Sequence, residues 1–324
     1  MTTLSNNLFS PISYDLQILN KNLQRMINAK HPILYAAAKH LFTTSGKKIR
    51  PAIVLLIAQT TMKNIEILPE HRRLAEITEI IHTASLVHDD VVDNCETRRG
   101  INTVHSTFNT KVAVLAGDFL FAQSSWYLAN LNNLKVVKTI SKVITDFAEG
   151  EVRQGLSYFD STISIDDYIE KSFYKTASLI AASCKSAAII SNVSEETQND
   201  FYIYGKHLGL AFQIIDDILD IIGSKELLGK PAGSDLRNGN LTAPLIFALE
   251  ENTDLYQYIN REFKNTEDIS KVIGIIKKTK GIQKAKDLAE EHMQASLQIL
   301  KKQNDCKAKK TLELISNYII YRLN

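Results

Sequence analysis

Glycine and proline are scarce in this chain, with 13 Gly and 6 Pro among its 324 residues. Turn-rich β-sandwiches and barrels use both residues often, and the alternation of apolar and polar residues typical of half-buried strands is nearly absent. Apolar residues recur instead at the spacing that places them on one face of a helix. We therefore expect an all-α chain.

Cysteine is also rare: Cys95, Cys184 and Cys306 are odd in number, widely spaced and form no Cys-x-x-Cys pair. This pattern excludes a disulfide framework or a zinc cluster and predicts reduced thiols in an intracellular protein.

The 38 basic and 36 acidic residues leave a net charge of only +2. No broad basic field for nucleic acid is expected, so any anion site must come from the local placement of charges.

The N-terminal residues MTTLSNNLFSPISYDLQ contain no basic segment followed by an apolar run, so we expect no targeting signal. No apolar stretch reaches the ~18 residues of a transmembrane helix. We expect the protein in the cytoplasm. Asn, Lys and Ile are abundant, which suits an AT-rich genome such as that of an organelle. If an organelle genome encodes the chain, we expect it in the plastid stroma. The glycine patterns of P-loops and Rossmann folds are absent, as is Gly-x-Ser-x-Gly.

Helical periodicity predicts a series of helices, and a capping box of Ser164 and Asp167 marks the start of one of them. No linker between these helices is long enough to separate domains. We therefore expect one domain over residues 1–324, a single large helical bundle around a central cavity. The predicted helices cover residues 12–29, 33–43, 51–62, 70–95, 107–131, 134–155, 164–191, 194–221, 241–250, 254–263, 267–278, 281–302 and 306–322.

Two copies of the pattern Asp-Asp-x-x-Asp lie in apolar, helix-like segments, SLVHDDVV and FQIIDDILDII. An apolar setting is costly for carboxylates, and like charges this close repel, so each copy needs a cation to stay ionised. Mg²⁺ suits carboxylate and phosphate oxygens. Two such helices side by side would direct six carboxylates into a common cavity: Asp89, Asp90 and Asp93 in the first motif, and Asp216, Asp217 and Asp220 in the second.

Residues four apart on a helix lie ~40° apart around its axis, so Asp89 and Asp93 share one face. His82 lies almost on the same stripe, which leaves it either a core histidine or a contact to a diphosphate. Gln213 lies one turn before Asp217 in the second motif.

Two neighbouring features have a structural interpretation. Asp166, Asp167 and Glu170 have a similar spacing, but they follow the capping residue Ser164, where the helix dipole favours acidic side chains. His88 precedes the first motif directly, and we expect it to pack between helices or to support the site.

Basic residues flank both motifs. Each of them alone would be read as a solvated surface charge, but together they indicate substrates with phosphate groups. They are Lys47 and Arg50 in SGKKIRP, Arg98 and Arg99 after the first motif, Lys175 with Thr176 in YKTASLI, and Lys230 in GKPAGSDLRNG.

The sequence from about Gly46 to Pro244 resembles the trans-isoprenyl (polyprenyl) diphosphate synthases, and in particular the cyanobacterial and plastid solanesyl-type enzymes. The motifs that carry the resemblance stand in family order: GKKIRP, IHTASLVHDDVVDNCETRRG, YKTASLI, GLAFQIIDDILD and GKPAGSDLRNGNLTAP. The resemblance implies an all-α isoprenoid synthase fold, a homodimer and Mg²⁺ dependence. It also implies condensation of isopentenyl diphosphate with an allylic diphosphate, and a product destined for the membrane.

The resemblance also assigns roles to the matching residues. Isopentenyl diphosphate would be held by Lys47, Arg50, His82 and Arg99. The allylic diphosphate would be contacted by Arg98, Lys175, Thr176, Gln213 and Lys230. Mg²⁺ would bind Asp89 and Asp93, supported by Asp90, and Asp216, Asp217 and Asp220.

Two positions depart from the pattern of many members. Ser45-Gly46-Lys47-Lys48 stands in place of Gly-Gly-Lys-Arg. Asn240 stands where many members have lysine, which puts a cationic role at that position in doubt.

Small residues one turn before the first motif, Ala84 and Ser85, predict a tunnel that is not closed there. Ile81 and Ile77 follow on the same face, so we expect a medium-to-long all-trans product for a quinone side chain, of about nine units by resemblance. Two alternatives stay open: the small residues permit close helix packing, or Phe119 or Phe121 closes the tunnel.

Three other functions compete with this interpretation. A terpene cyclase would carry an Asn/Ser/Glu-type second metal motif, and a non-catalytic regulatory subunit would lack intact aspartate motifs. An HD-type phosphohydrolase, indicated by His88-Asp89, would need further metal-binding histidines and would leave the second motif unexplained.

Overall fold

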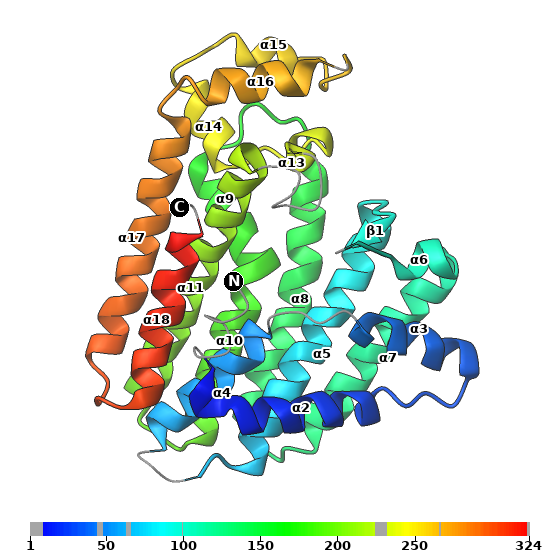
Figure 1. Cartoon of the computed structure of the whole chain (residues 1–324), viewed down its shortest axis with the longest axis vertical. Coiled ribbons are helices and arrows are strands. Elements are labelled where there is room, and N and C mark those ends of the chain that lie inside the picture. Colours follow the sequence, from blue (N-terminus) through cyan, green and yellow to red (C-terminus); the bar gives the residue numbers. More distant parts are fainter. Residues whose placement is uncertain are drawn as a thin grey trace. The chain divides into compact units, whose positions relative to one another are not determined.

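The structure, a computed structural model, describes residues 9–43, 48–62, 66–98, 100–223, 232–265 and 267–322. Nearly all regular elements are helices (Figure 1), as predicted. They are η1 (Ser10–Ile12), α2 (Ser13–Met26), α3 (Pro32–Thr43), α4 (Ile49–Thr61), α5 (Pro69–Val92), α6 (Val104–Thr107), α7 (Thr110–Ala129), α8 (Leu134–Leu156), α9 (Ile165–Ser172), η2 (Phe173–Ala177), α10 (Ser178–Ile190), α11 (Glu195–Ile222), α13 (Ser234–Arg237), α14 (Ala243–Leu249), α15 (Leu255–Asn260), α16 (Asp268–Ile276), α17 (Gly281–Lys301) and α18 (Lys307–Tyr321). A short hairpin pairs β1 (Thr97–Arg98) with β2 (Ile101–Asn102).

Most predicted helices are confirmed to within a few residues at each end, and three of the departures have identifiable causes. The helix expected over 70–95 ends at Val92, before Asn94 turns the backbone left-handed at φ 51°. The helix expected over 107–131 begins only at Thr110, because the Asn109 side chain accepts the backbone N–H of Val112 and caps α7. The helix expected over 164–191 contains a π-helical turn, η2, at its centre.

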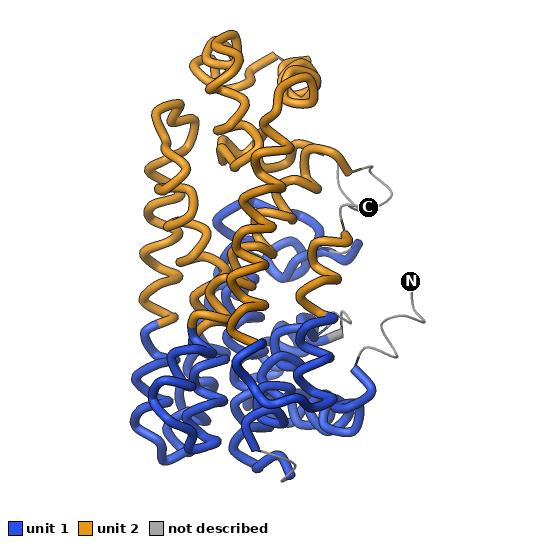
Figure 2. The backbone as a smooth tube through the Cα atoms, turned by 90° about the vertical axis from the view of Figure 1, so that its left-hand side faces the viewer, with its two compact units in different colours: residues 1–142, 182–202, 301–314 blue, residues 143–181, 203–300, 315–324 orange. Residues whose placement is uncertain are grey.

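The chain divides into two compact units, coloured separately in Figure 2. Unit 1 comprises residues 1–142, 182–202 and 301–314, and unit 2 comprises residues 143–181, 203–300 and 315–324. Each unit is described by itself. Among the described residues, no helix combines the length and the apolar character needed to cross a bilayer.

The core of unit 1 forms around α5, which packs against α4 and α7 (Figure 1). Small side chains on α7 bring the two backbones close together, and Ala113 and Ala116 join Val87 of α5 in one buried cluster. Gly117 lies against the ring of His88: a Cβ there would come within 2.2 Å of the histidine Nε2. This close approach fixes the part of α5 that leads into the first aspartate motif.

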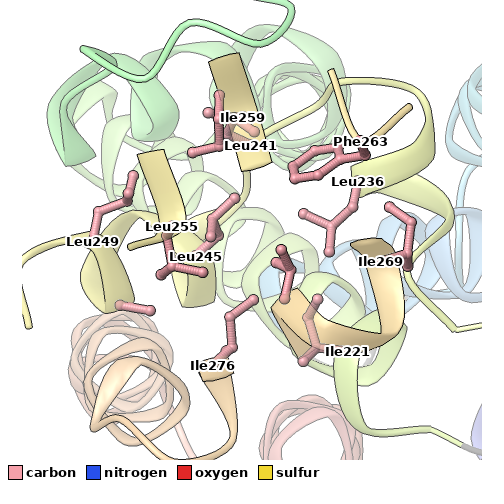
Figure 3. Close-up of a cluster of buried hydrophobic side chains, with 12 residues drawn as sticks. Ile221, Leu236, Leu241, Leu245, Leu249, Leu255, Ile259, Phe263, Ile269 and Ile276 are labelled. Carbon is pink, nitrogen blue, oxygen red and sulfur yellow. The ribbon is translucent and has the colours of Figure 1, made fainter. Parts of the chain in front are cut away.

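The core of unit 2 includes a cluster of side chains from α11, α13, α14, α15 and α16 that converge in Figure 3. Ile221 extends α11 directly after the second motif, while Leu236 and Leu241 are fully buried in the same cluster. The segment between these two leucines is therefore anchored beside the end of α11.

The π-turn η2 lies between two glycines of neighbouring helices in unit 2. A Cβ on Gly209 of α11 would lie 2.6 Å from the Cα of Ala177, and one on Gly150 of α8 would lie 3.0 Å from the Cβ of Tyr174. A π-turn adds one residue to a helical turn and is frequent at functional sites. Here it carries Lys175 and Thr176, and the glycines let it approach α8 and α11.

Replacing Gly209 by alanine should lower the free energy of unfolding by about 1–3 kcal/mol, because overpacking forces the backbone apart. Gly274→Ala is the matched control, since Gly274 lies in α16 with open space around it. Alanine there should raise stability by up to ~1 kcal/mol. Urea denaturation measures both changes, and equal effects at the two sites would contradict the close approach of η2 and α11.

Candidate active site

The first aspartate motif lies at the C-terminal end of α5, in unit 1. The backbone N–H of Asp93 donates to the carbonyl of Asp89 at 2.8 Å, so the helical register continues to the last carboxylate. Asp89 and Asp93 therefore keep the shared face that their spacing predicted. Both are half-buried, whereas Asp90 is buried.

Asp90 is compensated by Arg98, which the β1–β2 hairpin brings back over the end of α5. Arg98 Nε and Nη2 lie 2.8 and 2.7 Å from the same Asp90 oxygen. Burial opposes the charge of Arg98, but its hydrogen bond to Asp90 and the charge of that carboxylate outweigh burial and raise the pKa of Arg98. Asp90 thus orients Arg98 beside the other two carboxylates.

Arg50 and His82 are in contact within unit 1. Arg50 on α4 donates from Nη1 to Nε2 of His82 on α5, at 3.0 Å. Because guanidinium can only donate, His82 Nε2 accepts and the ring proton of the neutral tautomer sits on Nδ1. The structure thus places a permanent cation of α4 beside a histidine that lies two turns of α5 before Asp89.

The second aspartate motif, on α11 in unit 2, is more deeply buried. Asp217 is 4% exposed and accepts hydrogen bonds from Tyr168 Oη at 2.6 Å and Gln213 Nε2 at 2.7 Å. Asp220 accepts from Ser234 Oγ at 2.8 Å and from the backbone N–H of Asp235 at 3.2 Å. The motif's carboxylates are therefore held in fixed orientations by the surrounding elements.

Asp216 is half-buried and pairs with a residue near the end of the chain. Arg322 Nη1 lies 2.7 Å from its Oδ1, without the alignment of a hydrogen bond. The guanidinium also lies 5.2 Å from the centre of the Phe212 ring, one turn earlier on α11. The guanidinium of Arg322 thus forms an ion pair with one carboxylate of the motif.

The charge balance around Asp217 is poor. Burial, followed by the neighbouring carboxylate of Asp235, raises the pKa of Asp217 to about 8, although the hydrogen bonds from Tyr168 and Gln213 oppose the shift. A carboxylate that is ionised at this position at neutral pH needs additional positive charge close by.

Lys175 and Thr176 are directed by η2 toward different neighbours. Lys175 Nζ lies 2.9 Å from Glu151 Oε1 and donates to Gln154 Oε1 at 3.1 Å, both on α8. Thr176 Oγ1 donates to Gln213 Oε1 at 2.6 Å. Because the amide nitrogen of Gln213 donates to Asp217, the threonine fixes which end of the amide faces the carboxylate. The predicted residues Thr176, Gln213 and Asp217 thus form one chain of hydrogen bonds.

Three predicted site residues, Lys47, Arg99 and Lys230, lie outside the described residues.

The structural interpretations of the acidic segment after Ser164 and of His88 are confirmed. Ser164 and Asp167 form a reciprocal capping box at the start of α9, and the bonds from Ser164 lower the pKa of Asp167. His88 packs on Gly117, and its Nε2 lies 3.1 Å from the carbonyl oxygen of Val114.

Sequence reasoning missed three residues of the second motif's surroundings: Tyr168, Lys171 and Arg322. Tyr168 and Lys171 lie seven and four residues before Lys175, which on a helix places all three near one face. That spacing was a usable signal. Arg322 had none, because only the fold brings it to Asp216.

The donor set fits Mg²⁺. Both motifs offer carboxylate oxygens, the hard ligands this ion prefers, and a buried carboxylate with a raised pKa, Asp217, calls for a cation. Within the described residues, no three His, Cys, Asp or Glu side chains converge to hold a metal alone.

The chain is similar to known proteins over most of its length. Residues 31–276 match the family model "Polyprenyl synthetase". A prenyl transferase of Porphyra purpurea is 61% identical over 320 residues, covering 99% of both chains. A chloroplastic solanesyl-diphosphate synthase 2 of Oryza sativa subsp. japonica is 48% identical over 98% of this chain and 80% of its own. The crystal structure of heptaprenyl diphosphate synthase from Staphylococcus aureus superposes with a TM-score of 0.92 at 32% identity, covering 97% of this chain and 99% of the other.

Replacing an aspartate by asparagine should affect metal binding in only one of the two acidic segments. Asp217→Asn should weaken binding of Mn²⁺, used as a spectroscopic substitute for Mg²⁺, by at least about tenfold, because a unit charge close to the ion is lost. Asp167→Asn should leave Mn²⁺ binding unchanged and lower stability by at most ~1 kcal/mol, the usual scale of a capping interaction. Titration followed by electron paramagnetic resonance measures the first effect. Unchanged Mn²⁺ binding in Asp217→Asn would remove this residue from the metal site.

Proposed function

This chain belongs to the polyprenyl synthetase family and is a prenyltransferase, and we propose that it lengthens allylic diphosphates with isopentenyl diphosphate in the presence of Mg²⁺. The product is a medium- to long-chain all-trans polyprenyl diphosphate. We assign the product to the side chain of a membrane quinone and the protein to a plastid, and the chloroplastic rice relative supports the plastid location. Loss of the protein should then deplete that quinone.

The observation that carries the proposal is the hydrogen-bond chain Thr176–Gln213–Asp217. It joins a predicted diphosphate contact to a predicted metal ligand, and a diphosphate bound through a metal needs both kinds of residue. When bound, Mg²⁺ would neutralise charge on the leaving diphosphate. Lys175, Thr176 and Arg98 would hold the allylic diphosphate as its C–O bond breaks.

Isopentenyl diphosphate would be held by Arg50 and His82, with Lys47 and Arg99. Arg50 already donates one N–H to His82, and its planar guanidinium has further donors for phosphate oxygens. A bound second substrate places its double bond for attack on the allylic carbon, so positioning supplies much of the rate.

Apolar side chains protect the reactive allylic cation from water. Ile214, Ile215 and Ile218 lie next to the aspartates of the second motif in the sequence and are fully buried. Val87, just before the first motif, is buried as well. A dry site prevents hydrolysis of the cation. No side chain need act as a covalent nucleophile, and the departed diphosphate is the proposed acceptor of the proton that is lost.

The reaction is tested by incubating the purified full-length chain with Mg²⁺, labelled isopentenyl diphosphate and farnesyl or geranylgeranyl diphosphate. We expect extracted products longer than C20, and chelation of the metal should abolish them. Absence of any elongated product with metal and both substrates present would refute the proposed reaction. Products of C20 or shorter would refute only the chain length.

The chain-length proposal rests on the face of α5 that leads away from the first motif. Ala84, Ile81 and Ile77 are fully buried there, and the spacing places them on one stripe with His88. The ring of Phe121 on α7 lies 5.6 Å from the ring of His88, at the start of that stripe.

Ala84→Phe should shorten the product by several isoprene units, because an aromatic ring would fill the path of the growing chain. Chromatography of the dephosphorylated products measures the length. Phe121→Ala is the companion variant. A longer product from Phe121→Ala, with no change in Ala84→Phe, would place the closure at α7 instead.

The proposed assembly is a homodimer. Helix α7 is apolar on both faces: Ala116 and Leu120 are buried, while Leu115 and Trp126 are 50% and 60% exposed. A helix that is apolar all round is usually covered on both sides. Sedimentation should show a dimer, and the double variant Leu115→Glu/Trp126→Glu should be monomeric. A wild-type monomer at micromolar concentration would contradict this assembly.

A further inference from the structure

Lys171 on α9 is a buried cation to which the proposed reaction gives no role. Its side chain is only 6% exposed, and its Nζ donates to Asn240 Oδ1 at 2.6 Å. Burying an ammonium is costly unless the surroundings compensate for its charge. The contact goes to a neutral amide, so the compensation must come from charges beyond that hydrogen bond.

The backbone of Asn240 is held beside the second motif. The backbone N–H of Asn240 donates to the carbonyl of Asp235 at 2.9 Å, and the backbone N–H of Asp235 in turn donates to Asp220. On either side, Leu236 and Leu241 are buried in the cluster of Figure 3. Lys171 is therefore hydrogen-bonded to Asn240, and two further hydrogen bonds link Asn240 through Asp235 to Asp220, a predicted metal ligand.

The charges that compensate Lys171 are carboxylates of the same region. Burial lowers the pKa of Lys171, while the charges of Asp217 and Asp235 oppose that shift. Its Nζ also lies 5.9 Å from the centre of the Tyr168 ring, whose hydroxyl donates to Asp217. Two other cations near this motif, among the described residues, are held on carboxylates: Lys175 on Glu151 and Arg322 on Asp216.

We propose that Lys171, anchored on Asn240, is a positioning residue that serves as the built-in counter-charge of the second aspartate motif. The proposal rests on the proposed function, in which that motif binds Mg²⁺ together with a diphosphate. A fixed positive charge repels a bare divalent cation and attracts a diphosphate. Lys171 thus weakens metal binding to the substrate-free motif and strengthens binding of the diphosphate.

This role predicts opposite changes when the charge is removed at nearly constant volume. In Lys171→Met, Mn²⁺ should bind the substrate-free full-length protein about tenfold more tightly, and inorganic pyrophosphate with Mg²⁺ should bind about tenfold more weakly. Electron paramagnetic resonance of free Mn²⁺ and titration calorimetry with pyrophosphate measure the two affinities. A lysine needed only for packing would leave both unchanged or weaken both.

The contact to Asn240 allows the charge to be moved across one hydrogen bond. In Lys171→Met/Asn240→Lys, the ammonium starts from the other side of the 2.6 Å contact. Both affinities should return to within about threefold of wild type, since interaction energy depends on where the charge lies and not on which residue carries it. A double variant that keeps the values of Lys171→Met overturns the proposal.

The matched control is Lys185→Met. Lys185 also donates to an asparagine, Asn199, at 2.8 Å, but this pair is exposed and lies in unit 1. Neither affinity should change there. If Lys171→Met lowers the melting temperature so far that the protein unfolds, Lys171→Gln supplies the same loss of charge.

The outcomes separate the two proposals. A wild-type protein that binds neither Mn²⁺ nor pyrophosphate and forms no product contradicts the proposed function itself. A wild-type protein that binds both, with unchanged affinities in a folded Lys171 variant, contradicts only the counter-charge.

Discussion

Burial of carboxylates within apolar helices is the constraint on which the rest of unit 2 depends. Asp217 and Asp220 are 4% and 2% exposed, and a buried charge without partners would cost several kcal/mol. Three neighbouring elements therefore present donors or cations: α9 with Tyr168 and Lys171, α13 with Ser234, and the end of α18 with Arg322. Gly209 and Gly150 contribute to the same arrangement, because side chains at these positions would keep η2 too far away for Thr176 to reach Gln213.

The two motifs meet this constraint in different ways. The first obtains its counter-charge locally, since Arg98 follows Asp90 by only eight residues through the hairpin. The second draws its partners from across unit 2, up to Arg322. A local partner forms with the helix end itself, whereas distant partners arrive only when the whole unit folds. Binding at the second motif is thus coupled to tertiary structure, and its charge balance can be adjusted from several elements independently.

This difference also explains what the sequence could and could not predict. Helix periodicity, the capping box at Ser164 and the shared face of Asp89 and Asp93 depend on neighbours a few residues apart, and all three are confirmed. The π-turn was missed because it depends on glycines in two other helices. The role of Arg322 was missed because nothing near it in the chain indicates Asp216. The packing role of His88 was correctly expected, but its cause, Gly117, appears only in the structure.

Asn240 shows how a departure at one position changes meaning once its neighbours are known. The resemblance places lysine there in many members, so the asparagine reads as the loss of a cation. In the fold, the amide receives the ammonium of Lys171 from α9. The positive charge is therefore retained beside the motif and supplied from another helix. An electrostatic requirement constrains the location of a charge and leaves open which residue provides it. A sequence pattern records only the residue, so position 240 reads as the loss of a cation, whereas the structure shows the ammonium of Lys171 at that amide.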